Sequence, residues 1–179
     1  RDFPDELATE EVYRVMDDLR AFGVPVLILS GGEPLLRPDI FDIAQRAKTM
    51  GFYVGLSTNG TLIEAGHARR IAAAGFDYVG ISLDGLEATH DHFRRKEGAF
   101  RAALNGVRLC RGEGVKVGLR FTITRYNVDD VEDVCRLVAD EGLPRVCFYH
   151  LVYAGRGANL MGEDLDHEAT RRIVDQIVD

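Results

Sequence analysis

A four-part unit recurs along the chain and constrains the fold more than any other feature: an apolar strand, a polar loop, an amphipathic helix and a glycine. A helix beginning near Thr9 precedes the first unit, with Glu10 and Glu11 in its first turn and Gly23 after its end. The expected strands span residues 24–30, 53–57, 78–83, 116–122 and 145–151. The expected helices between them span residues 39–50, 64–74, 99–111 and 128–140, and a last helix begins near residue 166.

Strands that alternate with helices predict an α/β fold with a parallel sheet, because parallel neighbours need a crossover segment between them. No linker or shift in composition divides the chain. A chain of 179 residues is also long enough to bury a sizeable core. We therefore expect residues 1–179 to form one domain.

The net charge of −7 bears on the class of partner. Nucleic-acid binding needs clustered Lys and Arg to neutralise phosphates, so this charge favours a small-molecule substrate over nucleic acid. No apolar run approaches the roughly 20 residues needed to cross a bilayer, and the first residues lack the apolar segment of a signal peptide. We expect a cytoplasmic protein that does not bind membranes.

The cysteines do not form a metal-binding pattern. Cys110, Cys135 and Cys147 make neither CxxC nor CxxxCxxC, and each falls among apolar residues of an expected helix or strand, so all three are expected to be core thiols. His90 and His92 lack the spacing to a carboxylate on an expected helix that would support a metal site. The sequence predicts no metal site within these residues.

The loops differ strongly in character. Connections from helix to strand are short and marked by glycine, whereas connections from strand to helix are longer and hold nearly all the unusual polar residues. These polar loops span residues 30–34, 57–60, 82–85, 89–95, 124–127 and 153–157. Because the carboxyl ends of parallel strands meet at one edge of the sheet, we expect the polar loops to converge on one site.

The first polar loop contains Gly31, Gly32, Glu33 and Pro34. Two residues without Cβ allow a ligand close to the main chain, and the proline fixes the turn. Backbone carbonyls and the Glu33 carboxylate suit a ligand ammonium group. A tight turn with a solvated glutamate explains the same residues equally well.

The next loops also allow two interpretations. Asn59 stands in an Asn-Gly pair typical of turns, and its amide is also placed to face a ligand. Ser82 and Asp84 project to one side of their strand and suit a carboxylate and a sugar hydroxyl, respectively; a cap of the following turn is the alternative for Asp84. Arg94 suits a ligand carboxylate, which a guanidinium group matches well, or is simply solvated.

Further candidates for substrate contacts lie at the last two strand ends. They are Arg120, His150, Tyr153 and Arg156. For Arg120 a lumen-facing position and a local cap are both open. For His150 a core histidine with satisfied hydrogen bonds is the common alternative.

Taken together, the loops at residues 31–34, 59–60 and 82–85 resemble the motifs that bind S-adenosylmethionine (SAM) in the radical SAM superfamily. The resemblance covers nearly the whole chain and implies a partial (β/α)6 barrel whose first strand is missing, with SAM as cofactor. The implied SAM contacts are Gly32 and Glu33 for the ammonium group, Ser82 and Arg94 for the carboxylate, and Asp84 or Asn59 for the ribose.

The resemblance also exposes a departure from the family pattern. The CxxxCxxC motif that ligates a [4Fe–4S] cluster would lie just before Arg1, and a cysteine-rich C-terminal domain would lie beyond Asp179. The cluster and a reducing electron donor are therefore expected for the complete protein and not for this segment. Without the three cluster thiolates, the isolated segment is expected to be catalytically inactive.

A narrower resemblance concerns the substrate. Residues 29–39 and 90–94 resemble a branch that includes peptide-modifying and tetrapyrrole-modifying members. Within it, residues 51–57, 118–122 and 153–157 look most like the radical SAM proteins of haem d1 biosynthesis. That likeness implies a modified sirohaem as substrate, which loses propionate side chains through a 5′-deoxyadenosyl radical. A haem-synthesis decarboxylase and a peptide-modifying enzyme with auxiliary clusters are the alternatives within the branch.

Two alternatives come from other classes. A half TIM-barrel aldolase or decarboxylase would need a lysine or a metal-ligand set at the strand ends, and Lys48, Lys96 and Lys116 are not placed for it. A noncatalytic module that holds a nucleotide or a tetrapyrrole would use the same edge of the sheet.

Overall fold

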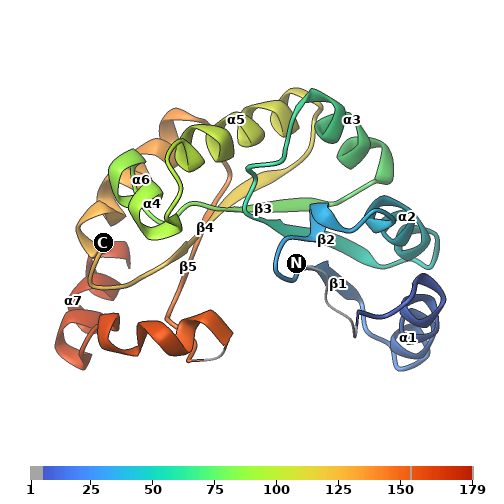
Figure 1. Cartoon of the computed structure of the whole chain (residues 1–179), viewed down its shortest axis with the longest axis horizontal. Helices are drawn as coiled ribbons and strands as arrows, with labels where there is room; N and C mark the ends of the chain where they lie inside the picture. The colour runs from blue at the N-terminus through green and yellow to red at the C-terminus, as the bar shows by residue number, and fades with distance from the viewer. Residues whose placement is uncertain (1–5, 154, 179) are drawn as a thin grey trace.

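The computed structural model describes residues 6–153 and 155–178, in which five parallel strands form one curved sheet (Figure 1). The strands are β1 (Val26–Leu29), β2 (Tyr53–Thr58), β3 (Tyr78–Ser82), β4 (Val117–Thr122) and β5 (Val146–Tyr149). Their order in the sheet is their order in the sequence. The structure therefore confirms the α/β fold, with the parallel sheet curved into part of a barrel.

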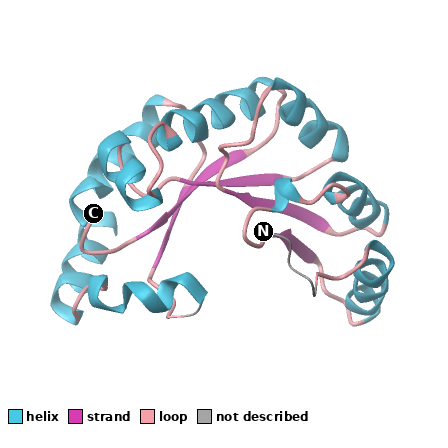
Figure 2. Cartoon of the chain, viewed as in Figure 1, coloured by secondary structure: helices cyan, strands magenta, loops and turns pink. Residues whose placement is uncertain are grey.

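The helices α1 to α6 line the outer face of the sheet, and η3 and α7 follow beyond β5 (Figures 1 and 2). The α-helices are α1 (Thr9–Ala21), α2 (Ile40–Thr49), α3 (Ala65–Ala74), α4 (Glu87–Arg94), α5 (Ala99–Gly112), α6 (Val131–Asp140) and α7 (His167–Val178). The 3-10 helices are η1 (Pro34–Leu36), η2 (Val128–Asp130) and η3 (Gly155–Glu163).

Alternation along each strand separates two faces of the sheet. Side chains such as Val54, Val79 and Leu119 are fully buried against the outer helices. We call the opposite side the inner face. Its strand positions are Val26, Ile28, Tyr53, Gly55, Ser57, Tyr78, Gly80, Ser82, Gly118, Arg120, Thr122, Cys147 and Tyr149.

The prediction of three core thiols is wrong for two of them. Cys110 is fully buried on α5, and burial raises the pKa of its thiol to about 11. Cys135 and Cys147 are only half-buried. Cys147 lies on the inner face of β5, which none of the outer helices covers.

The segment 89–95, expected as a loop, is mostly helical in the structure, as α4. Leu86, His90 and Phe93 recur at helical spacing, but the only buried residue of α4 is the polar His90. The apolar periodicity that identifies a helix was therefore weak. Arg95 ends α4 in the left-handed region, with φ of 52°.

Two other loop predictions are corrected in the same way. Pro34 to Leu36 form η1, and η3 begins at Gly155 inside the segment expected as the loop 153–157. The short glycine-marked connections behave as expected, because all the helix-ending glycines have positive φ. They are Gly23, Gly51, Gly75, Gly114 and Gly142.

We expect a side chain at Gly106, within α5, to destabilise the protein. A Cβ on this residue would stand 2.8 Å from the carbonyl oxygen of Gly60 and 3.1 Å from Cβ of Ile63. Gly106→Ala should therefore lower the free energy of unfolding by about 1–3 kcal/mol, despite alanine's higher helix propensity. Gly66→Ala in α3 is the matched control, since nothing lies within 4 Å of its added Cβ. Urea unfolding compares the two, and a Gly106→Ala protein as stable as the control would contradict the close approach.

Candidate functional site

The polar loops meet at the carboxyl edge of the sheet, and Glu33 joins the ends of β1 and β2. Its Oε1 accepts hydrogen bonds from Thr58 Oγ1 at 2.7 Å and from Leu35 N at 3.1 Å, and its Oε2 accepts one from Asn59 N at 2.8 Å. These donors are all neutral. The interpretation of Glu33 as a freely solvated side chain is wrong, because both oxygens are fixed between two loops.

The main chain beside Glu33 is open. Nothing lies within 4 Å of a Cβ placed on Gly31 or on Gly32, and Gly31 has a φ of 153°, which side-chain-bearing residues rarely adopt. Pro34 is buried and begins η1. A ligand can therefore approach the backbone at both glycines, next to a carboxylate of fixed orientation.

Asn59 takes part in turn formation. Its Oδ1 accepts hydrogen bonds from the backbone nitrogen of Thr61 at 2.8 Å and from Thr61 Oγ1 at 2.7 Å. The turn interpretation of this residue is thus supported by its contacts. The predicted ribose contact of Asn59 stays a prediction.

Asp84 organises the ends of β3 and β4. It is 1% exposed, its Oδ1 accepts a hydrogen bond from Thr122 N at 2.9 Å, and its Oδ2 forms an ion pair with Arg94. Its backbone nitrogen donates to His90 Nδ1 at 2.9 Å, and its carbonyl oxygen accepts from Asn127 Nδ2 at 3.1 Å. Every polar group of Asp84 is therefore bonded within the protein.

The capping role considered for Asp84 is wrong. The next backbone donor available for capping, Leu86 N, bonds instead to Oδ2 of Asp130 at 2.7 Å. Gly85 makes this contact possible, since a Cβ there would lie 2.6 Å from the same oxygen. The predicted ribose contact of Asp84 stays a prediction. In the structure the Asp84 carboxylate contacts Arg94 and Thr122 N.

Arg94 is held in place and is not a solvated arginine. Its side chain is 26% exposed, and the ion pair with Asp84 fixes one of its terminal nitrogens. Its Nε is buried and has no hydrogen-bond partner among the described residues. A guanidinium group that is bonded to a carboxylate through one terminal nitrogen still has N–H donors available for an anionic ligand.

His90 is buried at the centre of this cluster, with 1% exposure and an edge-on contact to Phe100. Burial lowers its pKa to about 4, and the charge of Arg94 acts in the same direction. The ring is therefore neutral at pH 7. Because Nδ1 accepts the Asp84 bond, the proton lies on Nε2.

Sequence reasoning missed the contributions of His90, Asn127 and Asp130 to this cluster. Asn127 is fully buried and also bonds Thr124 N and the carbonyl oxygen of Thr122. Its side chain therefore connects the end of β4, the loop that follows it and the carbonyl oxygen of Asp84. Asn127 lies 43 positions from Asp84, and Asp130 lies 44 positions from Leu86, and no sequence pattern links residues so far apart. Only the unusual polarity of these loops could have pointed to the cluster.

The candidates for substrate contacts fall in different environments. Arg120 is half-buried on the inner face, directly opposite Ser82 in the register of β3 and β4. His150 is exposed, so its interpretation as a core histidine is wrong. Tyr153 is exposed and its hydroxyl contacts the carboxylate of Asp164. The side chain of Arg156 lies outside the described residues.

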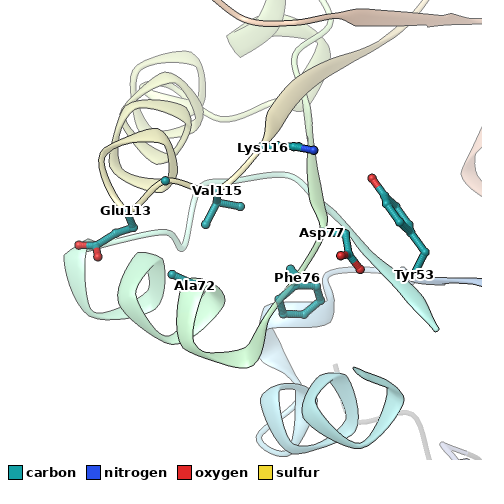
Figure 3. Close-up of a pocket in the computed structure, with 8 residues that line it drawn as sticks. Tyr53, Ala72, Phe76, Asp77, Glu113, Val115 and Lys116 are labelled. Atoms are coloured by element: carbon teal, nitrogen blue, oxygen red, sulfur yellow. The ribbon is translucent and has the colours of Figure 1, made fainter. Parts of the chain in front are cut away.

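A shallow pocket of about 270 Å³ lies at the opposite, amino-terminal edge of the sheet (Figure 3). Its lining includes Tyr53, Asp77 and Lys116, which stand at or just before the first residues of β2, β3 and β4. The Asp77 carboxylate is already occupied by Lys48 Nζ at 2.6 Å and Val54 N at 2.7 Å. We therefore place the functional site at the carboxyl edge, where the polar loops converge.

Within residues 6–153 and 155–178, no group of three or more His, Cys, Asp or Glu side chains is placed to hold a metal ion. Over the same ranges, no helix has the length and apolar character required to cross a membrane.

The curved parallel sheet, with its glycine loop and acidic residue at one edge, agrees with a family match. The model of the radical SAM superfamily matches residues 1–138, and the chain belongs to this superfamily. It is 50% identical over 177 residues to the pre-heme d1 synthase of Dinoroseobacter shibae, and 49% identical over 178 residues to the Fe-coproporphyrin III synthase of Methanosarcina barkeri. Each match covers 99% of this chain but only 44% and 45% of the relative, respectively.

Solved structures support the same fold. SuiB of Streptococcus suis bound to S-adenosylmethionine aligns with a TM-score of 0.84 at 15% identity, over 100% of this chain and 42% of that chain. The structure of native anSMEcpe with bound AdoMet aligns with a TM-score of 0.76 at 18% identity, over 96% of this chain and 50% of that chain.

The low pKa of His90 predicts a pH dependence of stability. Above pH 6.5 the ring is neutral in both the folded and the unfolded chain, so the contribution of His90 to the free energy of unfolding is complete. Between pH 6.5 and about 4 only the unfolded chain takes up the proton, which favours unfolding. Stability should fall by up to about 3 kcal/mol over this window. His90→Asn keeps an acceptor for Asp84 N but does not titrate, so urea unfolding should show a smaller loss for this variant. Parallel pH curves for the two proteins would contradict a buried neutral histidine.

Proposed function

We propose that this chain is the SAM-binding core of an enzyme of haem d1 biosynthesis that removes propionate side chains from a modified sirohaem. The observation that carries the proposal is the 50% identity to a pre-heme d1 synthase across 99% of the chain. The proposed location is the cytoplasm, where a reducing partner would supply electrons.

A second candidate is an enzyme of haem synthesis that forms an iron coproporphyrin. The 49% identity to the Fe-coproporphyrin III synthase favours it about equally. Similarity to peptide-modifying relatives is lower, at 30% identity for the PqqA peptide cyclase of Gluconobacter oxydans. Both leading candidates act on a tetrapyrrole, which is the substrate class that we propose.

The carboxyl edge of the sheet suits the amino-acid end of SAM. Glu33 carries a negative charge bonded only to neutral donors, and open backbone lies at Gly31 and Gly32. This combination suits the ammonium group. Arg94 and Ser82 are proposed to bind the carboxylate, which a guanidinium group and a hydroxyl recognise by charge-assisted hydrogen bonds.

We propose that the complete protein also holds a [4Fe–4S] cluster. Among the described residues no set of cysteines is placed to hold it. When bound, SAM and the reduced cluster supply a radical that abstracts a hydrogen atom. The residues of this chain would hold SAM and the substrate in a fixed mutual position and exclude water.

The role of Arg94 can be tested through SAM affinity. In the full-length protein, Arg94→Ala should raise the Kd for SAM by about tenfold or more, because a charge-assisted hydrogen bond is lost. Arg94→Lys keeps the cation beside Asp84 and should bind SAM with intermediate affinity. Arg101→Ala, an exposed arginine of α5, is the control. Calorimetry measures all four proteins, and an Arg94→Ala protein with the affinity of the unmodified protein would remove Arg94 from the site.

The proposed reaction is tested on the product. Anaerobically purified full-length protein, reduced with dithionite, is given SAM and the modified sirohaem, and the products are examined by mass spectrometry. We expect 5′-deoxyadenosine together with a tetrapyrrole that has lost propionate side chains. Formation of an iron coproporphyrin instead would select the second candidate. Absence of 5′-deoxyadenosine would leave a noncatalytic binding module and contradict the proposal.

A further inference from the structure

Two arginines at the inner face stack on tyrosines. The guanidinium carbon of Arg120 lies 4.6 Å from the ring centroid of Tyr149, and that of Arg145 lies 4.7 Å from the ring centroid of Tyr78. Arg145 directly precedes β5 and stands beside Gly118 of β4. Stacking of this kind restrains a guanidinium plane without using its N–H donors.

Two glycines on the inner face leave room for the two arginine–tyrosine pairs. A Cβ on Gly80 would stand 2.7 Å from Cδ of Arg120. A Cβ on Gly118 would stand 2.5 Å from the hydroxyl oxygen of Tyr78 and 2.8 Å from Cγ of Arg145. Any larger residue at either glycine would displace one arginine–tyrosine pair, so the two glycines fix where the pairs lie.

Neither guanidinium is neutralised in the described part of the chain. The ion pairs found there involve other arginines and one lysine, and neither Arg120 nor Arg145 donates a side-chain hydrogen bond to a described residue. The inner-face positions of the strands also include no Asp or Glu, although the whole chain has a net charge of −7. The inner face is therefore a locally cationic surface with free N–H donors.

The two arginines lie at different depths. Arg120 stands opposite Ser82, next to the carboxyl edge where SAM is proposed to bind. Arg145 stands beside Gly118, two residues before Arg120 on β4, which is roughly 7 Å deeper along the strands. A ligand that reaches both must extend from the SAM site along the inner face.

We propose that Arg120 and Arg145 bind two carboxylate groups of the substrate, so that the inner face recognises a flat polycarboxylic acid. Arg120 holds the carboxylate nearest to SAM, and Arg145 holds one that lies deeper. This inference rests on the proposed tetrapyrrole substrate, whose macrocycle carries several carboxylates around its rim. Guanidinium groups suit such partners because they form paired hydrogen bonds to a carboxylate.

The test uses coproporphyrin III as the probe and its neutral tetracarboxamide as the control ligand, titrated into the full-length protein and followed by absorbance. The unmodified protein should bind the acid about tenfold or more tightly than the amide. Arg120→Gln and Arg145→Gln should each weaken binding of the acid by about tenfold and leave binding of the amide unchanged. Arg136→Gln, which removes an exposed arginine from α6, should have no effect.

Gly80→Ala provides a variant that retains both charges. Its added Cβ should displace Arg120 and weaken binding of the acid as Arg120→Gln does, while Arg120→Lys should bind with intermediate affinity. Circular dichroism shows that each variant is folded, and SAM affinity is measured in parallel. For the unmodified protein, affinity for the acid should also fall with added salt.

The outcomes separate this inference from the proposed function. If the unmodified protein prefers the acid but both glutamine variants bind it normally, the assignment of the arginines is wrong and the tetrapyrrole substrate stands. If Arg120→Gln loses affinity for SAM and not for the acid, Arg120 belongs to the SAM site and its assignment is wrong. If the unmodified protein cleaves SAM yet binds neither probe, the tetrapyrrole substrate fails together with this inference.

Discussion

The bonds of Asp84 hold together the part of the molecule on which the site depends. One residue at the end of β3 is connected to α4 through His90 and Arg94, to β4 through Thr122, and to the following loop through Asn127. Burying a carboxylate is unfavourable unless it is paired and fully hydrogen-bonded, and here both conditions are met. The chain at the end of β3 is thus fixed from several sides, and with it the orientation of Arg94.

The carboxyl edge carries opposite charges at two separate places. Glu33, between the ends of β1 and β2, accepts hydrogen bonds from neutral donors. Arg94, beyond the end of β3, forms an ion pair with the carboxylate of Asp84. Asn59 follows β2 and Ser82 ends β3, and these two strands are neighbours in the sheet. An amino acid carries an ammonium group and a carboxylate close together, so this distribution of charge is complementary to the proposed ligand.

The inner face adds a second kind of recognition. Gly80 and Gly118 remove side-chain bulk from two neighbouring strands, and the space is taken up by the long side chains of Arg120, Arg145 and Tyr78. The stacked guanidinium and tyrosine groups give this face planar surfaces. Such surfaces suit a rigid, flat ligand more than a flexible one, because less conformational entropy is lost on binding.

The sequence by itself determined the parallel α/β fold, the order of its elements and the edge at which the polar loops meet. Those conclusions depend on periodicity and on glycine positions, which are local properties of the chain. Only the tertiary structure decided that residues 87–94 form the helix α4, that His150 is exposed and that Asp84 forms an ion pair with Arg94. Burial and hydrogen-bond partners are set by tertiary contacts, such as those of Asp84 with Thr122 and Asn127, which lie 38 and 43 positions further along the chain, and local periodicity does not report such contacts.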